Sequence, residues 1–297
     1  MFTAVLTCAP GAPVIEPALV TALKNGWGGG RDVQARWLHP GVAAEFDIYR
    51  VPDTLAVTRA DLDRMGIDVN VVPSRGRCKR LLLADMDSTM IEQECIDELA
   101  AEAGVGARVA AITARAMDGE IDFEGALRER VGLLKGLPEA VIHRVLATRI
   151  TLMPGGPALL GTMKAHGAKA ALVSGGFTAF TEDIARRLGF DWNRANTLLV
   201  ENGALTGEPG LPILGREAKV QALEDLTAEM GIGAEDVIAV GDGANDLGML
   251  TRAGMGVALH AKPAVQAEAG LRVNHGDLTT LLYLQGYHVD DVVLSQE

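Results

Sequence analysis

A short run of apolar residues, Leu81–Ala84, leads directly into Asp85-Met86-Asp87-Ser88-Thr89. The run is typical of a buried β-strand, and side chains two residues apart along a strand project to the same side. Two carboxylates ~4 Å apart repel by about 4 kcal/mol at an effective dielectric constant of about 20. A cation, a bound proton or both must offset that repulsion, and Mg²⁺ is the cation we expect. The alternative is a turn or helix cap, where Asp, Ser and Thr are common.

Strand patterns alternate with helical patterns through the rest of the chain. This order predicts an α/β fold with a doubly wound parallel sheet, in which ligands bind beyond the carboxyl ends of the strands. Loops far apart in the sequence should therefore meet near Asp85. The Asn202-Gly203 pair predicts a β-hairpin that is peripheral to the chemistry. The expected strands cover residues 79–84, 169–173, 236–240, 255–259 and 271–273.

Three downstream segments could supply the phosphate-binding groups, the positive charge and the further metal ligands that the aspartate pair lacks. Ser174-Gly175-Gly176 follows a predicted strand and opens a helix, which suits a phosphate cradle built from backbone N–H groups, although such a sequence can also be a simple turn. Lys219 lies in the first turns of a predicted helix, where a lysine is usually solvated. Gly241-Asp242-Gly243-Ala244-Asn245-Asp246 places two carboxylates and an amide in one glycine-rich loop, which favours a hard cation.

Residues 92–153 show helical periodicity and almost no strand signal, as in the apolar spacing of Phe123, Leu127, Val131 and Leu134 after a capping Asp122. This insertion predicts a helical cap over the site. A Pro- and Gly-containing stretch at 73–77 predicts a domain boundary, with a domain at 1–76 and a second one at 77–297. The first 76 residues give the order βαββαβ, which suits a small ferredoxin-like sandwich that is either regulatory or a structural appendage.

The 297 residues carry a formal net charge of -12, which argues against binding to nucleic acid or to an acidic membrane surface. Cys8, Cys78 and Cys95 are too few and too scattered for a disulfide framework or a zinc site. No apolar run reaches the ~18 residues of a membrane span, and the first residues lack the basic start of a secretion signal. We therefore expect a cytoplasmic protein.

Together these motifs resemble the haloacid dehalogenase (HAD) superfamily, in which an Asp-x-Asp strand end, a Ser or Thr, a Lys and a late Gly-Asp-x-x-x-Asp loop follow in this order. The resemblance is closest to its phosphoserine phosphatase family and covers roughly residues 79–287. Met86 stands where the family often has Phe, which is a conservative apolar change. The narrower resemblance is carried by Asp85-Met86-Asp87-Ser88-Thr89 with Glu94, by 117–123, by 127–131 and by 174–178.

The resemblance implies a catalytic role for Asp85, Asp87 and Lys219. Asp85 would attack phosphorus and form an aspartyl phosphate, while Asp87 would protonate the leaving oxygen and then activate water. The metal ligands would be the side chains of Asp85 and Asp242 and the backbone carbonyl of Asp87. Asn245 and Asp246 would orient waters, with Lys219 behind the metal ligands.

For the substrate, the resemblance assigns the phosphoryl oxygens to Ser174, Gly175, Gly176 and Lys219. It also assigns the carboxylate to Arg130, the ammonium to Glu94 and an apolar gate to Phe123, and it includes Asn245 among the substrate-binding residues. On the residues alone, Arg130 could equally pair with Glu124 or Glu129, and Glu94 could be a solvated helix residue.

The activity that follows is Mg²⁺-dependent hydrolysis of O-phospho-L-serine to serine and phosphate, the last step of serine biosynthesis. The alternatives are a phosphatase or phosphotransferase for another small phosphomonoester, and a sensor without catalysis that binds an amino acid or phosphate. The position of residues 1–76 suits an ACT-like regulatory module. The choice between Mg²⁺ and Mn²⁺ and the pairing of two copies into a homodimer stay open at this point.

Overall fold

The computed structural model describes residues 1–28, 33–117 and 120–294. The N-terminal part forms an antiparallel sheet with the strand order β2-β3-β1-β4, which confirms the expected βαββαβ order. The glycine-rich turn expected at 26–30 lies partly outside the described residues. The elements are β1 (Phe2–Cys8), α1 (Pro17–Gly26), β2 (Arg36–His39), β3 (Ala43–Ile48), α2 (Leu55–Asp63) and β4 (Ile67–Pro73).

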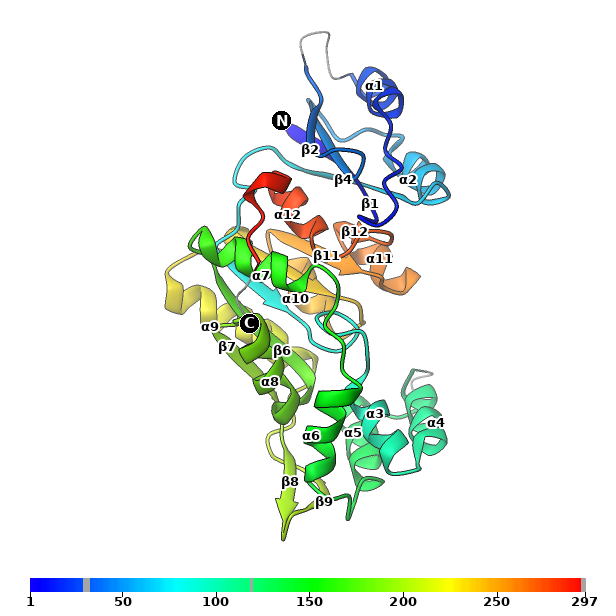
Figure 1. Cartoon of the computed structure of the whole chain (residues 1–297), viewed down its shortest axis with the longest axis vertical. Coiled ribbons are helices and arrows are strands. Elements are labelled where there is room, and N and C mark those ends of the chain that lie inside the picture. Colours follow the sequence, from blue (N-terminus) through cyan, green and yellow to red (C-terminus); the bar gives the residue numbers. More distant parts are fainter. Residues whose placement is uncertain (29–32, 118–119, 295–297) are drawn as a thin grey trace.

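The core is a parallel six-stranded sheet with the order β12-β11-β10-β5-β6-β7. It lies in the middle of the molecule (Figure 1). This sheet confirms the predicted doubly wound α/β class and all five predicted strands, and it adds β7, which the sequence patterns did not reveal. The strands are β5 (Leu81–Ala84), β6 (Lys169–Phe177), β7 (Trp192–Asn196), β10 (Val237–Gly241), β11 (Met255–Leu259) and β12 (Leu271–Val273).

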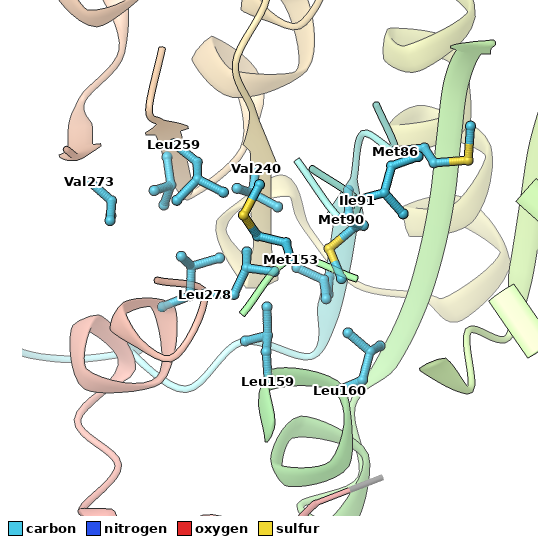
Figure 2. Close-up of a cluster of buried hydrophobic side chains, with 14 of the residues drawn as sticks. Met86, Met90, Ile91, Met153, Leu159, Leu160, Val240, Leu259, Val273 and Leu278 are labelled. Atoms are coloured by element: carbon cyan, nitrogen blue, oxygen red, sulfur yellow. The ribbon is translucent and has the colours of Figure 1, made fainter. Parts of the chain in front are cut away.

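Alternate side chains of the core strands are buried in two separate hydrophobic clusters, one on each face of the sheet. Leu82 and Val240 belong to the first cluster, and Leu81 and Ala239 to the second. Figure 2 shows the first cluster, in which Val240 and Leu259 face Leu159 of α7. The core helices are α7 (Gly156–Ala165), α8 (Thr178–Leu188), α9 (Arg216–Met230), α10 (Leu247–Arg252), α11 (Pro263–Glu268) and α12 (Thr280–Gln285), with short 3₁₀ turns at Ala234–Asp236 and Val289–Asp291.

Side chains of the N-terminal sheet cover the free edge of β12. The Asn70 amide donates to the carbonyl of Arg272 (2.7 Å) and accepts from its N–H (3.0 Å). Asp68 accepts from the backbone N–H groups of Asn274 and His275 at 2.9 and 3.0 Å. An exposed strand edge invites pairing with another chain, so these contacts both protect β12 and join the two sheets.

The segment predicted to form the cap contains α3 (Cys95–Glu102), α4 (Gly106–Met117), α5 (Phe123–Gly132) and α6 (Ala140–Thr148), which lie at the end of the molecule opposite the N-terminal sheet (Figure 1). Asp122 caps α5 as expected, because its carboxylate accepts from Gly125 N at 2.7 Å. The two ends of the insertion meet in a bridge between Ile91 and Leu152.

The predicted hairpin is present as β8 (Leu198–Glu201) and β9 (Ala204–Pro209). Asn202 and Gly203 both have positive φ (53° and 77°), as a tight two-residue hairpin turn requires. The hairpin contacts the cap, since Gly136 N donates to the carbonyl of Leu205 at 2.8 Å. Among the described helices, none is long and apolar enough to cross a membrane.

Candidate active site

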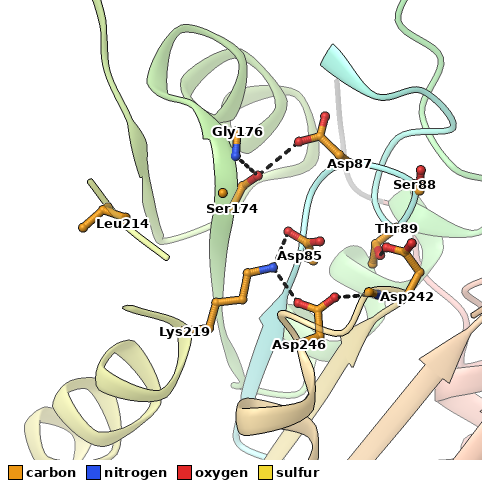
Figure 3. Close-up of polar contacts among 12 residues, drawn as sticks. Asp85, Asp87, Ser88, Thr89, Ser174, Gly176, Leu214, Lys219, Asp242 and Asp246 are labelled. Carbon is orange, nitrogen blue, oxygen red and sulfur yellow. Dashed lines mark hydrogen bonds and ion pairs between the residues drawn. The ribbon is translucent and has the colours of Figure 1, made fainter. Parts of the chain in front are cut away.

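The site lies at the carboxyl ends of β5, β6 and β10, as the predicted topology requires. Asp85 and Asp87 follow β5 and are separated by the fully buried Met86. Although they are only two residues apart, their carboxylates have different partners. Figure 3 shows Asp85 beside Lys219 and Asp87 beside Ser174.

Lys219 is buried, in contrast to the solvated position usual for a lysine near a helix start. Its side chain comes from the first turns of α9 and is 2% exposed. The ammonium lies 2.6 Å from Asp85 Oδ1 and 2.5 Å from Asp246 Oδ1. Burial alone would lower the pKa of Lys219, but the charges of Asp85 and Asp246 outweigh it and raise that pKa. Lys219 is therefore a fixed positive charge at the centre of the site.

Asp85, Asp242 and Asp246 form a compact acidic group, with one oxygen from each within 4.8 Å of the others. Asp246 reaches it because Gly241 has no side chain: a Cβ there would lie 2.3 Å from Asp246 Cγ. Thr89 Oγ1 donates to Asp242 Oδ1 at 3.1 Å, and Gly243 N donates to Asp246 Oδ2 at 2.9 Å.

This acidic group fits a divalent cation. Lys219 forms ion pairs with Asp85 and Asp246 but not with Asp242, so a single ammonium faces three carboxylates. Burial, followed by the charge of Asp246, raises the pKa of Asp85 and raises that of Asp242 to about 6. The group therefore lacks positive charge, and its hard oxygen donors are those that Mg²⁺ prefers. Asp246 joins Asp85 and Asp242 here, although the sequence suggested for it only the orientation of waters.

The carboxylate of Asp87 lies outside this group. Its Oδ1 accepts from Cys95 N at 2.8 Å and its Oδ2 from Ser174 Oγ at 3.2 Å. Burial raises the pKa of Asp87, and the hydrogen bonds from Cys95 and Ser174 only partly oppose this. The assignment of the Asp87 backbone carbonyl to a metal stays a prediction.

Ser174, Gly175 and Gly176 lie in β6, which continues to Phe177, so the prediction that the strand ends at residue 173 and gives way to a loop was wrong. The strand is irregular here, because its pairing with β7 shifts register between Val173 and Phe177. Gly176 N donates to Ser174 Oγ at 2.8 Å, and a Cβ on Gly176 would lie 2.6 Å from Asp87 Oδ2. Glycine is thus required at 176 for Asp87 and Ser174 to meet.

Asn196 is a buried residue of the site that the sequence analysis missed. Its Nδ2 donates to the carbonyls of Gly175 (2.9 Å) and Leu214 (3.2 Å), and its Oδ1 accepts from Leu214 N (2.7 Å). Asn196 ends β7 and therefore ties β6 to the segment that leads into the helix of Lys219. An Asn at the end of a strand could have indicated a site residue, but Asn196 was not identified because the sequence patterns do not predict β7.

Two cap residues expected at the substrate face the core residues. The ring of Phe123, at the start of α5, lies 3.2 Å from the position that a Cβ on Gly175 would take. Glu94 is the residue before α3 and accepts from Ser88 Oγ at 2.7 Å. Although Glu94 remains partly open to solvent, desolvation of its carboxyl, followed by the charge of Asp87, raises its pKa to about 7. Phe123 thus contacts the core at Gly175, and Glu94 contacts it at Ser88.

Arg130 projects from α5 and makes no ion pair with a carboxylate in the described part of the chain. Its Nε donates to the carbonyl of Ala126 at 3.2 Å, whereas Glu124 pairs with Arg128 and Glu129 with Arg115. The surface ion pairs considered for Arg130 are thus made by other arginines. Burial lowers the pKa of Arg130, and the charges of Asp97, Glu94 and Asp87 oppose this lowering.

Asn245 is partly exposed in the loop between Asp242 and Asp246, and its side chain makes no hydrogen bond within the described ranges. The structure thus brings Asp85, Asp87, Ser174, Lys219 and Asp242 together. It adds Asp246 and Asn196 to the residues that shape the site.

A family model described as haloacid dehalogenase-like hydrolase matches residues 82–251. The chain is 45% identical over 225 residues to a phosphoserine phosphatase of Archaeoglobus fulgidus (75% of this chain, 65% of that protein). It is 46% identical over 210 residues to a phosphoserine phosphatase of Albidiferax ferrireducens (69% of this chain, 89% of that protein). The chain spans less than two thirds of the length of some of these relatives, including the Archaeoglobus protein.

Solved structures give the same relationship. A HAD-family hydrolase of Salmonella enterica superposes with a TM-score of 0.85 and 32% identity, covering 95% of this chain and 98% of the other. A phospho-aspartyl intermediate analogue of a phosphoserine phosphatase has a TM-score of 0.65 and 41% identity, covering 69% and 98%. The resemblance predicted from the motifs is confirmed, and the chain belongs to the haloacid dehalogenase-like hydrolase family.

Proposed function

We propose that this protein is a phosphoserine phosphatase that hydrolyses O-phospho-L-serine through an aspartyl-phosphate intermediate. The observation that carries the proposal is the separation of two neighbouring aspartates: Asp85 is held by Lys219, and Asp87 by Ser174 and the Cys95 N–H. One carboxylate is thus available as a nucleophile and the other as an acid. The similarity to several phosphoserine phosphatases supports the choice of substrate.

In the first step, an Asp85 carboxylate oxygen attacks phosphorus, and the bond from phosphorus to the seryl oxygen breaks. Asp87 donates its proton to that oxygen, so serine leaves as the neutral alcohol. The raised pKa of Asp87 suits this task, because a carboxyl with an ordinary pKa near ~4 would hold no proton at neutral pH.

In the second step, water attacks the phosphorus of the aspartyl phosphate while Asp87 accepts its proton. The bond from phosphorus to the Asp85 oxygen breaks, which releases phosphate and restores both carboxyls. Lys219, which lies beside Asp85, and Ser174, which lies beside Asp87, would hold the phosphoryl oxygens. The charge on these oxygens must be stabilised in the transition state. The cap contacts this part of the core through Phe123, whose ring lies next to Gly175.

The group formed by Asp85, Asp242 and Asp246, with the Asp87 carbonyl, would hold Mg²⁺. The ion would supply positive charge for the phosphoryl oxygens and offset the mutual repulsion of the carboxylates. For the rest of the substrate, Arg130 would bind the carboxylate, and Glu94 would accept from the ammonium. Both residues lie in the cap region. The residues that select the amino acid would therefore belong to a different part of the protein from those that transfer the phosphoryl group.

The central test is Asp85→Asn. We expect turnover of phosphoserine to disappear while the circular dichroism spectrum stays that of the native protein. Asp236→Asn is the matched control, since this partly exposed aspartate precedes β10 at the opposite end of that strand and pairs only with Arg80 at 3.9 Å. Unchanged activity of Asp85→Asn would falsify the covalent mechanism.

A substrate panel tests the assigned specificity. Phosphoserine should have a higher kcat/KM than p-nitrophenyl phosphate, and Arg130→Gln should remove most of that advantage without a comparable loss on p-nitrophenyl phosphate. Equal kcat/KM values for both substrates in the native protein would reject the roles of Glu94 and Arg130. Such a result would favour a phosphatase for another small phosphomonoester.

We also propose that residues 1–76 are an ACT-like regulatory domain and that residues 77–297 are the catalytic domain with its cap at about 92–153. The antiparallel βαββαβ sheet supports this division. A place at the end of serine biosynthesis, a cytoplasmic location and pairing of two copies stay predictions. Phosphoserine hydrolysis by the full chain in the presence of added serine tests the regulatory role, because inhibition that exceeds simple product competition is expected.

A further inference from the structure

A small pocket lies where the N-terminal sheet meets the core. It is lined by residues of α2, β4, α11, β12 and the segment that follows β12, which lie together in Figure 1. Its volume is about 180 Å³, which corresponds to the liquid volume of roughly six water molecules at about 30 Å³ each. This is smaller than the ~300–1,000 Å³ of sites for drug-sized ligands, so the pocket suits a compact ligand.

Two arginines from the two sides of the junction line this pocket. Arg59 comes from α2 and Arg272 from β12. Both side chains line the same pocket, and burial, followed by the positive charge of Arg272, lowers the pKa of Arg59. Arg59 donates only to the carbonyls of Val69 and Gly270, at 3.1 and 3.4 Å, and neither arginine has an ion-pair partner among the described residues. Two neighbouring cations of this kind favour an anion between them.

The acidic residues of the pocket are engaged elsewhere. Asp68 accepts from the backbone N–H groups of Asn274 and His275, and Asp63 lies 2.9 Å from the His275 imidazole. The charge of Asp68 raises the pKa of Arg59, but this effect is smaller than the lowering by burial and by Arg272. These carboxylates therefore interact with the residues of the pocket wall, and the positive charge of the two arginines remains free to attract an anion.

Two buried polar atoms of the pocket residues have no hydrogen-bond partner: Arg272 Nε, a donor, and Asn274 Oδ1, an acceptor. A buried polar atom without a partner is unfavourable, because it has lost its hydrogen bonds to water. A ligand with an anionic oxygen for Arg272 and a hydroxyl for Asn274 would satisfy both. Asn274 Nδ2 already contacts Asp63 Oδ1 at 3.3 Å, which fixes the orientation of the amide with its oxygen as the unpaired atom.

We propose that this junction pocket binds a small oxyanion that also carries a hydroxyl group, with Arg59 and Arg272 as the anion ligands and Asn274 Oδ1 as the hydroxyl acceptor. Monohydrogen phosphate and small 2-hydroxycarboxylates share this chemistry. Because the ligand contacts both α2 and β12, its binding strengthens the attachment of the N-terminal sheet to the core. The inference uses no residue of the catalytic site and does not depend on the substrate proposed above.

Calorimetric titration of the full chain with inorganic phosphate, and separately with glycolate, tests the proposal. Arg59→Gln and Arg272→Gln should each weaken binding of the preferred probe about tenfold or more, because a charge-assisted hydrogen bond contributes about 1.5–3 kcal/mol. Arg64→Gln is the matched control, since this exposed arginine follows α2 and pairs with Asp61 at 2.6 Å. The stronger of the two probes identifies the kind of oxyanion.

Phosphate is also expected to bind at the catalytic site, and this contribution should be the same in the native chain and in every variant. Only a difference in dissociation constant between these proteins therefore measures binding at the junction pocket. The kcat/KM for p-nitrophenyl phosphate should stay unchanged in each variant, which verifies that the catalytic part is folded. If Arg272→Gln does not fold, Arg59→Gln decides alone. Equal dissociation constants for both probes in Arg59→Gln, Arg64→Gln and the native chain would overturn the proposal.

Discussion

Lys219→Met removes the ammonium that pairs with Asp85 and Asp246 while it keeps most of the apolar stem. The ammonium lies 2.6 Å from Asp85 Oδ1, and two unit charges at that distance attract by about 6 kcal/mol at an effective dielectric constant of about 20. The cost of burying both charges offsets part of this attraction. Breaking a buried pair by removing one partner typically destabilises a protein by about 3–5 kcal/mol, and we expect a loss in this range for the metal-free protein at pH 8.

The loss should be smaller at pH 5 than at pH 8. Without Lys219, the pKa of Asp85, already raised by burial and by Asp246, rises further. A carboxyl whose pKa is higher in the folded state than in the unfolded state makes folding less favourable as the pH rises from the unfolded pKa to the folded one. At low pH the buried carboxyl is protonated and needs no cation. The destabilisation relative to the native protein therefore grows with pH.

Urea unfolding in EDTA, followed by circular dichroism at both pH values, measures this loss. Lys169→Met is the matched control, because Lys169 is 51% exposed and its pair with Asp191 (2.9 Å) should contribute only about 0–1 kcal/mol. Turnover of phosphoserine by Lys219→Met with Mg²⁺ present should fall about 10²–10³-fold, as for the loss of one donor to a transition-state oxyanion. Equal stability of the two lysine variants at pH 8, or native turnover by Lys219→Met, would refute this reasoning.

Asn196→Ala should destabilise the protein by about 2–4 kcal/mol, because it leaves buried backbone groups of β6 and of the segment before α9 without hydrogen-bond partners. It should also lower kcat more than it raises KM. Urea unfolding and kinetics measure both effects, and Asn193→Ala in the same strand is the control. The preference for phosphoserine over p-nitrophenyl phosphate should fall from pH 8 to pH 6, since Glu94, with a pKa of about 7, becomes neutral there and loses its attraction for the ammonium. Glu94→Gln should show a low preference at every pH, and Glu92→Gln the native profile. Removal of divalent cations with EDTA should abolish turnover, and Mg²⁺ should restore it.

The position of the site could be predicted because it depends on strand ends. In a parallel sheet, the residues that follow β5, β6 and β10 must meet at one edge, whatever their separation in the sequence. Asp85, Ser174 and Asp242 were placed together on this ground alone. The cap residues needed the family resemblance, since helical periodicity in 92–153 identifies buried positions but cannot assign a substrate role to Glu94 or Arg130.

The parts that could not be predicted depend on contacts between distant residues. β6 extends past its two glycines because Phe177 pairs with Asn196 of β7 after the register shift. β7 has no apolar alternation, because its first residues are partly or fully exposed. The role of Asn196 exists only once β6, β7 and the start of α9 are adjacent. Local propensity contains none of this information, which explains why the strand was ended too early at residue 173.

The site shows how two chemically identical side chains can take different roles. Asp85 faces a lysine and two more carboxylates, so a cation can keep it ionised and nucleophilic. Asp87 is held instead by one backbone N–H and one hydroxyl, which stabilise its charge less than the lysine and a cation stabilise that of Asp85. The difference arises because Met86 is buried and Gly176 leaves room for Asp87 Oδ2, so the chain turns between the two aspartates. A side chain at position 176 would therefore displace the proposed acid before it affected the nucleophile.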